Sequence, residues 1–287
     1  MGTLYASPTP RFFEPGTGSE PGTGSEPVLS VEKLGLSFGG VVAIDDLTLD
    51  ARAGEVLGIV GPNGAGKSSL LNCISAYYRP TSGRILVQGH DVSRLSPHQV
   101  ARRGVGRTFQ NARLFLGLSV LDNLMVAAAS AQGWLVAAAV IRPWGLRREA
   151  KLRRGVEEIL DFLDLSAYRD QASGLLGYGL RKRVDLGRAI ARNPHLLLLD
   201  EPMAGMNQDE KADMARFIIE LNRDAGLPVV LVEHDMAVVS DLCDRVVVLD
   251  WGKLLAEGRP DEVLQRPDVV AAYIGTGPVV SGGTDTN

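Results

Sequence analysis

Four short runs of the chain are almost entirely apolar, and a polar residue or glycine follows each of them within two positions. They are residues 55–60 (EVLGIV), 195–200 (HLLLLD), 228–234 (PVVLVEH) and 245–250 (RVVVLD). Strands that are buried on both faces of a parallel sheet have this composition, because helices cover both faces. The runs therefore predict the central strands of an α/β sheet.

Segments with a helical pattern lie between these runs. The sequence predicts helices after Gly66 and over residues 181–193, 210–226 and 236–244. Alternation of strand and helix indicates crossover connections, and hence an α/β domain with a mainly parallel sheet.

Two regions do not follow this alternation. Residues 39–54, before the first buried run, predict an antiparallel β region at one side. Residues 119–172 have no strand pattern and many Ala, Leu, Arg and Glu, so they predict an inserted helical subdomain, which we place at about residues 119–180.

The ends of the chain differ from its middle. Residues 14–27 read EPGTGSEPGTGSEP, a repeat too rich in Pro, Gly, Ser and Glu to bury a core, and one that an added linker would also resemble. We predict disordered or flexible tails at residues 1–27 and 276–287, and a folded domain over residues 28–275.

Composition excludes several classes of protein. The chain has 287 residues and a net charge of −4, which argues against a general nucleic-acid binder. Cys73 and Cys243 are far apart and without metal-like spacing, so we expect reduced, buried thiols of a cytosolic protein. The chain also lacks a secretory signal and any run of the about 18 apolar residues that a membrane span needs. A membrane role would therefore come through a partner.

Residues 61–68 (GPNGAGKS) match the pattern G-x-x-x-x-G-K-[ST], placed after a predicted strand and opening a helix. In such a P-loop the glycines let backbone amides close around phosphates, Lys67 adds a positive charge, and the Ser68 hydroxyl can ligate Mg²⁺. A side chain at Gly64, in mid-loop, would most directly block the nucleotide. An accidental glycine-rich turn is the alternative. The predicted nucleotide-binding residues here are Gly61, Pro62, Asn63, Gly64, Ala65, Gly66, Lys67, Ser68 and Ser69.

Two adjacent acids end the apolar run at 195–200. An acid there lies at the carboxyl edge of the sheet, where α/β domains bind ligands. Asp200 can hold Mg²⁺ through water, and Glu201 can act as general base toward an attacking water. Taken alone, the pair could equally be an acidic turn.

A glycine-rich stretch, residues 174–183 (GLLGYGLRKR), precedes the helix predicted at 181–193. Free amides and the macrodipole at a helix N-terminus can hold an anion. A plain loop before a helix is the alternative, and nothing in the local sequence decides between them.

Five motifs in this order resemble those of ABC transporter ATPase subunits. They are GPNGAGKSS, RTFQ (107–110), the glycine-rich stretch, LLLLDEP and VEHD (232–235), and the resemblance covers residues 28–275. It implies a P-loop NTPase core with an antiparallel β region and a helical subdomain, with ATP and Mg²⁺ as cofactors. The N-K-x-D guanine motif of P-loop GTPases is not found.

The resemblance also assigns roles to single residues. Gln110 corresponds to the glutamine that touches Mg²⁺ and links the nucleotide to the membrane partner. His234 corresponds to the histidine that senses the γ-phosphate, and Phe38 lies where the family stacks an aromatic ring on adenine. By themselves these would be a surface glutamine, a structural histidine and a core phenylalanine. The implied catalytic residues are Lys67, Glu201 and His234, and the implied metal ligands are Ser68, Gln110 and Asp200.

In the family the glycine-rich stretch is the signature loop, usually L-S-G-G-Q, which closes over ATP held by a second subunit. Here Gly177 replaces the serine and Leu180 the glutamine, while Tyr178 and Gly179 lie between them. A hydroxyl bonded to a charged phosphate contributes roughly 1.5–3 kcal/mol. We therefore expect Gly177, Tyr178 and Gly179 to form a working but weakened loop.

A narrower resemblance points to the ATPases of branched-chain amino acid importers. It rests on Tyr178, on residues 202–207 (PMAGMN) with Asn207 where many relatives have aspartate, and on residues 107–115, 118–127 and 256–275. It implies an ATPase that lies on the cytoplasmic face of the membrane and powers the import of branched-chain or other hydrophobic amino acids. The implied partners are permease subunits, a second ATPase subunit in a homo- or heterodimer, with a heterodimer favoured, and indirectly a solute-binding protein, but no nucleic acid.

Three alternatives stay open: a weakly hydrolysing regulatory subunit, an ATPase of another transport system, and an ABC protein that acts on ribosomes or DNA. The last usually carries two cassettes or long coiled-coil insertions, which this chain lacks.

Overall fold

The computed structural model describes residues 27–110, 112–131 and 142–274. Apart from Pro27, both predicted tails lie outside this range, so they stay predictions, as does the part of the predicted insert at residues 132–141. None of the helices within the described residues is long and apolar enough to cross a membrane.

The main sheet has the strand order β10-β9-β3-β8-β7-β6. Its neighbouring strands are parallel, except that β10 is antiparallel to β9. Every residue of β3, β7 and β8 is buried, which explains the continuously apolar runs. The strands are β3 (Val56–Val60), β6 (Val105–Arg107), β7 (Leu196–Asp200), β8 (Val229–Val232), β9 (Arg245–Asp250) and β10 (Lys253–Gly258).

All four apolar runs therefore form strands as predicted. The third ends earlier than the pattern indicated: β8 stops at Val232, so that Glu233 and His234 lie in the following loop. Both cysteines are free and buried, as predicted.

A second sheet, antiparallel throughout, has the order β2-β1-β4-β5. Its strands are β1 (Leu29–Phe38), β2 (Val41–Ala51), β4 (Ser82–Val87) and β5 (His90–Asp91). The antiparallel region predicted at residues 39–54 contains β2, whereas its partner β1 precedes that region and was not predicted. The fold class is thus confirmed: a mainly parallel α/β core with an antiparallel β region and added helices.

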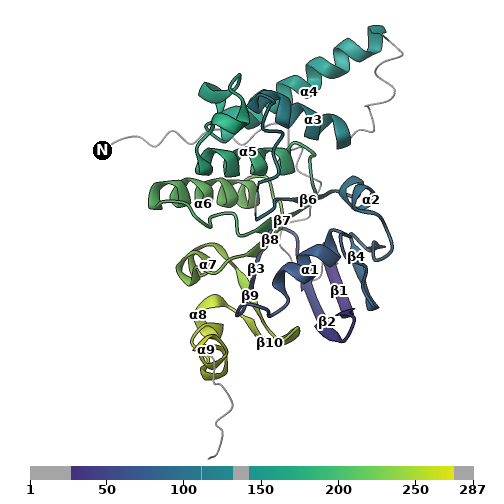
Figure 1. The fold of residues 1–287 in the computed structure, drawn as a ribbon, viewed down its shortest axis with the longest axis vertical. Helices are drawn as coiled ribbons and strands as arrows, with labels where there is room; N and C mark the ends of the chain where they lie inside the picture. Colours follow the sequence, from purple (N-terminus) through teal and green to yellow (C-terminus); the bar gives the residue numbers. More distant parts are fainter. Residues whose placement is uncertain (1–26, 111, 132–141, 275–287) are drawn as a thin grey trace, which may run out of the picture.

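Helices cover the main sheet on both sides and extend away from it (Figure 1). They are α1 (Lys67–Ile74), α2 (Pro97–Arg102), α3 (Val120–Ala131), α4 (Arg142–Phe162), α5 (Tyr178–Ile190), α6 (Gln208–Arg223), α7 (Met236–Leu242), α8 (Pro260–Val263) and α9 (Pro267–Ile274). In Figure 1, α5 and α6 lie between the main sheet and the pair α3 and α4, while α1 lies beside the antiparallel sheet.

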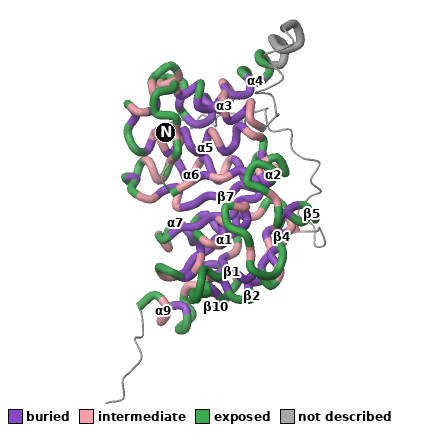
Figure 2. The backbone as a smooth tube through the Cα atoms, turned by 45° about the vertical axis from the view of Figure 1, so that its right-hand side comes forward, coloured by how far each residue is buried: buried purple, intermediate pink, exposed green. Residues whose placement is uncertain are grey.

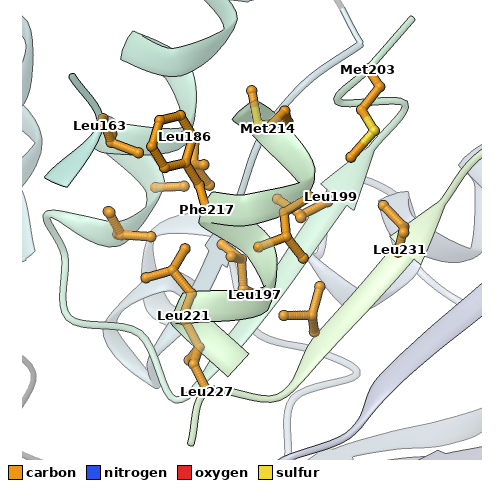
Figure 3. Packing of buried hydrophobic residues seen from close by; sticks show 14 of the residues in the cluster. Leu163, Leu186, Leu197, Leu199, Met203, Met214, Phe217, Leu221, Leu227 and Leu231 are labelled. Carbon is orange, nitrogen blue, oxygen red and sulfur yellow. The ribbon is translucent and has the colours of Figure 1, made fainter. Parts of the chain in front are cut away.

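Two hydrophobic clusters hold these layers together. One lies between the main sheet and α3 to α6, where Phe217 of α6 packs with Leu197 of β7 and Leu186 of α5 (Figure 3). The other lies between the two sheets and includes α1. In Figure 2 the buried backbone accordingly runs through β7 and α5, and exposed residues lie around it.

Helix α5 begins at Tyr178, three residues before the predicted start, and Gly179 in its first turn permits a close approach to α6. A Cβ on Gly179 would lie 2.2 Å from Glu210 Oε1 at the start of α6. Asn207 caps α6 by accepting from the backbone N–H of Glu210 at 2.9 Å. The N-termini of the two helices therefore lie side by side.

Candidate functional site

The loop between β3 and α1 has a conformation that only glycine adopts readily. Gly61 has φ 147° and Gly66 has φ 100°. A Cβ would lie 2.1 Å from Leu249 O at Gly61 and 2.6 Å from Ala43 O at Gly66. Gly64 also has a positive φ, 84°, but a Cβ there would meet no protein atom within 4 Å. This loop therefore leaves open space at Gly64, where a side chain was predicted to block the nucleotide.

A cavity of about 200 Å³ opens at this loop. Its lining brings together predicted residues from separate segments: Asn63, Gly64, Ala65, Gly66, Lys67, Ser68, Ser69, Glu201 and His234, with Ala43 as an addition that the sequence did not indicate. Backbone amides, an ammonium group and a hydroxyl at one helix N-terminus are the donors that a polyphosphate needs.

Lys67 is nearly buried and points back into the loop. Its Nζ donates to Gly61 O at 2.7 Å and to Pro62 O at 2.9 Å. Burial lowers the pKa of Lys67, and the nearby Glu201 and Asp200 carboxylates oppose that shift. An anion in the cavity would compensate the cation that burial disfavours.

Three predicted residues meet at one carboxylate. Glu201 follows β7 with a positive φ of 48°. Its Oε2 accepts from Gln110 Nε2 at 2.9 Å, and its Oε1 lies 2.5 Å from His234 Nε2. The Glu201 side chain is only 13% exposed. A nearly buried carboxylate at the edge of the cavity, held from both sides, is placed to take a proton from a water molecule.

Asp200 is buried next to Glu201 and pairs with an arginine. Arg107 Nη2 donates to Asp200 Oδ2 at 3.0 Å, and both side chains are more than nine-tenths buried. Arg107 Nη1 also donates to Asn72 Oδ1 at 2.8 Å. Arg107 therefore joins β6, α1 and the end of β7. Arg107 belongs to the RTFQ motif, but nothing local in the sequence indicates a buried ion pair.

The residues predicted as metal ligands are not gathered in one ready-made cluster. Among the described residues, no group of three or more His, Cys, Asp and Glu side chains could hold a metal ion by itself. Ser68 lines the cavity. Asp200 instead contacts Arg107, and Gln110 contacts Glu201. Mg²⁺ usually takes one or two protein ligands together with phosphate oxygens and water, so these residues fit a site that a nucleotide completes.

Phe38 ends β1 as an exposed aromatic residue. It is 47% exposed and packs edge-to-face on Tyr78, with ring centroids 5.0 Å apart. Phe38 is absent from the cavity lining, but its strand pairs with β2, which carries Ala43. Tyr78, which the sequence analysis missed, therefore forms a second aromatic ring at the predicted base position.

The signature loop points away from this cavity. Gly177 precedes α5, no side chain caps the helix, and Tyr178 is 46% exposed. Arg181 holds the loop by donating to Leu176 O at 2.9 Å and Gly174 O at 2.7 Å. Leu180 packs against the hydrophobic cluster, which accounts for an apolar residue there. None of Gly177, Tyr178 and Gly179 lines the cavity at Lys67.

Three features together define a P-loop nucleotide-binding domain: a glycine loop between buried strand β3 and a helix, a lysine at the helix start, and a held acid directly after the parallel strand β7. Comparison with known proteins identifies its family. Residues 44–204 match the family described as ABC transporter, and residues 253–278 match that described as branched-chain amino acid ATP-binding cassette transporter.

Curated relatives agree over nearly the whole fold. The chain is 36% identical over 249 residues to the high-affinity branched-chain amino acid transport ATP-binding protein BraF of Pseudomonas aeruginosa, covering 86% of this chain and 98% of that protein. It is 36% identical over 255 residues to LivG of Escherichia coli, with the same coverage. It is also 32% identical over 248 residues to the lipopolysaccharide export system ATP-binding protein LptB of Haemophilus influenzae, covering 86% and 97%.

Solved structures agree as well. A nucleotide-free ATP-binding cassette from an ABC transporter superposes with a TM-score of 0.76 at 29% identity, covering 87% of this chain and 100% of that one. The ADP conformation of an ATP-binding cassette gives 0.75 at 29% identity, covering 88% and 100%. The chain belongs to the ABC transporter family and is one of its ATP-binding ATPase subunits.

Proposed function

We propose that this chain hydrolyses ATP to power an importer for branched-chain or other hydrophobic amino acids. The contact of Gln110 and His234 with the Glu201 carboxylate, at the edge of the P-loop cavity, is the observation that carries the hydrolytic part of the proposal.

ATP would supply the phosphoryl group, and the chain's residues would hold it. The backbone N–H groups of residues 61–69, apart from Pro62, which has none, and the Lys67 ammonium would bind the phosphates, while Phe38 would stack on the base. Ser68, Gln110 and Asp200 would hold Mg²⁺, Asp200 through water. Glu201 would accept a proton from the attacking water, and His234 would keep that carboxylate oriented.

A second ATPase subunit would complete the site. Gly177, Tyr178 and Gly179 lie outside the chain's own cavity, at an exposed and uncapped helix N-terminus. Such an end offers amide donors to an anion of another subunit. We therefore propose a head-to-tail dimer, preferably of two different subunits, in which the missing hydroxyl at Gly177 slows turnover.

The permease would dock beside Gln110. A cavity of about 350 Å³ separates α2 from α3 and α5, and residues from the segment after Gln110, including Phe115, line it with Val100, Val126 and Arg188. Phe115 is 49% exposed there. Docking at this cavity would place the chain on the cytoplasmic face of the membrane, and a solute-binding protein would meet only the permease.

The branched-chain assignment is supported by BraF and LivG and by the match of residues 253–278. The 32% identity to LptB supports a second candidate, an ATPase of a different transport system, because a subunit of lipopolysaccharide export matches over the same share of the chain.

Reconstitution with the candidate permease pair and a second ATPase subunit tests the proposal. We expect ATP hydrolysis that leucine and its binding protein stimulate, and a loss of about a hundredfold or more in kcat for Glu201→Gln. Glu262→Gln, an exposed residue at the start of α8, is the matched control.

Phosphate release at background by the unaltered protein would instead support a regulatory subunit. ATP hydrolysis that another solute stimulates, but hydrophobic amino acids do not, would support the second candidate, an ATPase of a different transport system.

A further inference from the structure

A buried ammonium group on the signature helix touches two other functional segments. Lys182 lies in the second turn of α5 and is only 3% exposed. Its Nζ donates to Gln110 O at 2.7 Å and to Glu201 O at 3.0 Å. One side chain therefore holds the backbones of the two residues whose side chains meet at 2.9 Å.

The backbone of Glu201 needs such a partner. Its φ of 48° is unusual for a residue with a side chain and costs of order 1–3 kcal/mol unless the surroundings impose it. Glu201 N donates to Val232 O at 2.9 Å on one side, and Lys182 binds the carbonyl on the other. The two contacts fix the direction in which the carboxylate leaves the chain.

A second residue of α5 binds the segment that contains Gln110. Asp185, also buried, accepts from the backbone N–H of Phe109 at 3.0 Å. Together, Lys182 and Asp185 bind the consecutive residues Phe109 and Gln110 from one helix face.

Lys182 also contacts the signature loop. Its Nζ lies 5.7 Å from the centre of the Tyr178 ring, one helical turn earlier. The same ring lies 3.2 Å from where a Cβ on Gly205 would be, in the segment after Glu201. Tyr178, Lys182 and the Glu201 segment therefore form one continuous set of contacts.

From this geometry we propose that Lys182 is a positioning residue for hydrolysis: it aligns Glu201 with Gln110 and links their alignment to the signature loop. The proposal rests on the proposed function, since Tyr178 would face the ATP of a second subunit. Closure of the dimer on that ATP would then change, through Lys182, the position of the Glu201 carboxylate in the chain's own site.

The test compares Lys182→Met with Lys182→Arg in the assembled transporter. Methionine has a similar length and no donors, whereas a guanidinium can still bridge two carbonyl oxygens. We expect Lys182→Met to lower kcat by about tenfold or more with the KM for ATP within about twofold, and Lys182→Arg to recover most of the loss. Lys151→Met, an exposed lysine of α4, is the matched control.

Hydrogen exchange on the full chain without nucleotide gives an independent readout. Lys182→Met should exchange amides faster in peptides that cover residues 105–110 and 201–206, with the β3 and α1 peptides unchanged, and Lys151→Met should match the unaltered protein. A failure of transport would contradict the proposed function but would not affect the exchange measurement, which is made on the chain alone.

Two outcomes would overturn the proposal. One is a kcat for Lys182→Met within twofold of the unaltered protein together with unchanged exchange in those peptides. The other is an equal defect in Lys182→Arg with faster exchange throughout the chain, because that would mark a residue needed only for folding.

Discussion

The P-loop and the signature loop each lead through glycines into a helix, but their glycines differ. In the P-loop, Gly61 and Gly66 have positive φ, and a Cβ on either would lie within 2.6 Å of a backbone oxygen. In the signature loop, Gly177 has φ −61°, and a Cβ there would meet nothing within 4 Å. At these positions the first loop is enclosed by its own chain and the second is open. The contrast does not extend to Gly64, which has open space around it, or to Gly179, which lies against Glu210.

The side chains beside the two loops differ in the same way. Lys67 and Glu201 face the P-loop cavity, so that site has its charged groups before any partner arrives. At the signature loop, Tyr178 and Leu175 are exposed, at 46% and 76%. We infer that the P-loop binds nucleotide within the chain and that the signature loop acts only toward another subunit.

Lys67→Ala should have the largest effect. Removing the ammonium takes away the only lysine or arginine that lines the cavity among the described residues, so the Kd for ATP should rise by about a hundredfold or more. Titration with a fluorescent ATP analogue measures this, with Lys151→Ala as control. Tight binding by Lys67→Ala would place the nucleotide elsewhere.

Gly61→Ala and Gly177→Ala compare the two loops directly. Gly61→Ala combines a positive φ with a clash against Leu249 O, so we expect it to lower the free energy of unfolding by about 2 kcal/mol or more. Gly177→Ala should change it by less than about 0.5 kcal/mol. Chemical denaturation of both variants gives the two free energies of unfolding. Equal losses of stability would contradict the proposed difference between the P-loop and the signature loop.

Asp185→Asn tests the helix behind the signature loop. Burial raises the pKa of Asp185 to about 6, above its unfolded value of about 3.8. The folded state therefore binds the proton more tightly, and stability from this group falls as pH rises through about 4 to 6. Asparagine carries no charge, and its side-chain oxygen can still accept the hydrogen bond from the backbone N–H of Phe109.

We expect Asp185→Asn to stabilise the chain by about 1 kcal/mol at pH 8 and by less at pH 5. Unfolding curves at the two pH values measure the difference. A gain of the same size at both would mean that the charge of Asp185 has no part in it.

Gly177→Ser should have the smallest effect. The open space around Gly177 admits a hydroxyl that can donate to a phosphate of the second subunit. Most of this bond would form with bound ATP before the chemical step and would lower KM, so kcat of the assembled transporter should rise by only about threefold. ATPase assays at saturating ATP measure the change. A lower kcat would show that the glycine is itself required.

The sequence alone predicts much of the core but less of its edges. The strands β3, β7, β8 and β9 were predicted because both faces are buried, which makes each run continuously apolar. Strands β1 and β4 include exposed and half-buried positions, and β6 has only three residues, so no similar run marks them. Helix α5 was placed three residues late, because glycine is usually a poor helix former and the close approach of Glu210 cannot be read locally.

The sequence likewise predicts some residues of the candidate site and not others. The residues of the P-loop are contiguous, so the pattern itself predicts them. Gln110 and His234 were found only through family resemblance, because each alone is an ordinary polar residue. Arg107 and Lys182 were missed as contact residues: their partners Asp200 and Glu201 are 93 and 19 residues away in the chain, and only the folded sheet brings them together.

Calorimetric titration of the full chain with Mg-ATP, for the unaltered protein and for Gly177→Ala, shows whether the P-loop binds nucleotide without the signature loop. We expect one ATP per chain with the same affinity in both, because the P-loop is complete within the chain. Absence of binding in the unaltered protein, or loss of binding in Gly177→Ala, would contradict it.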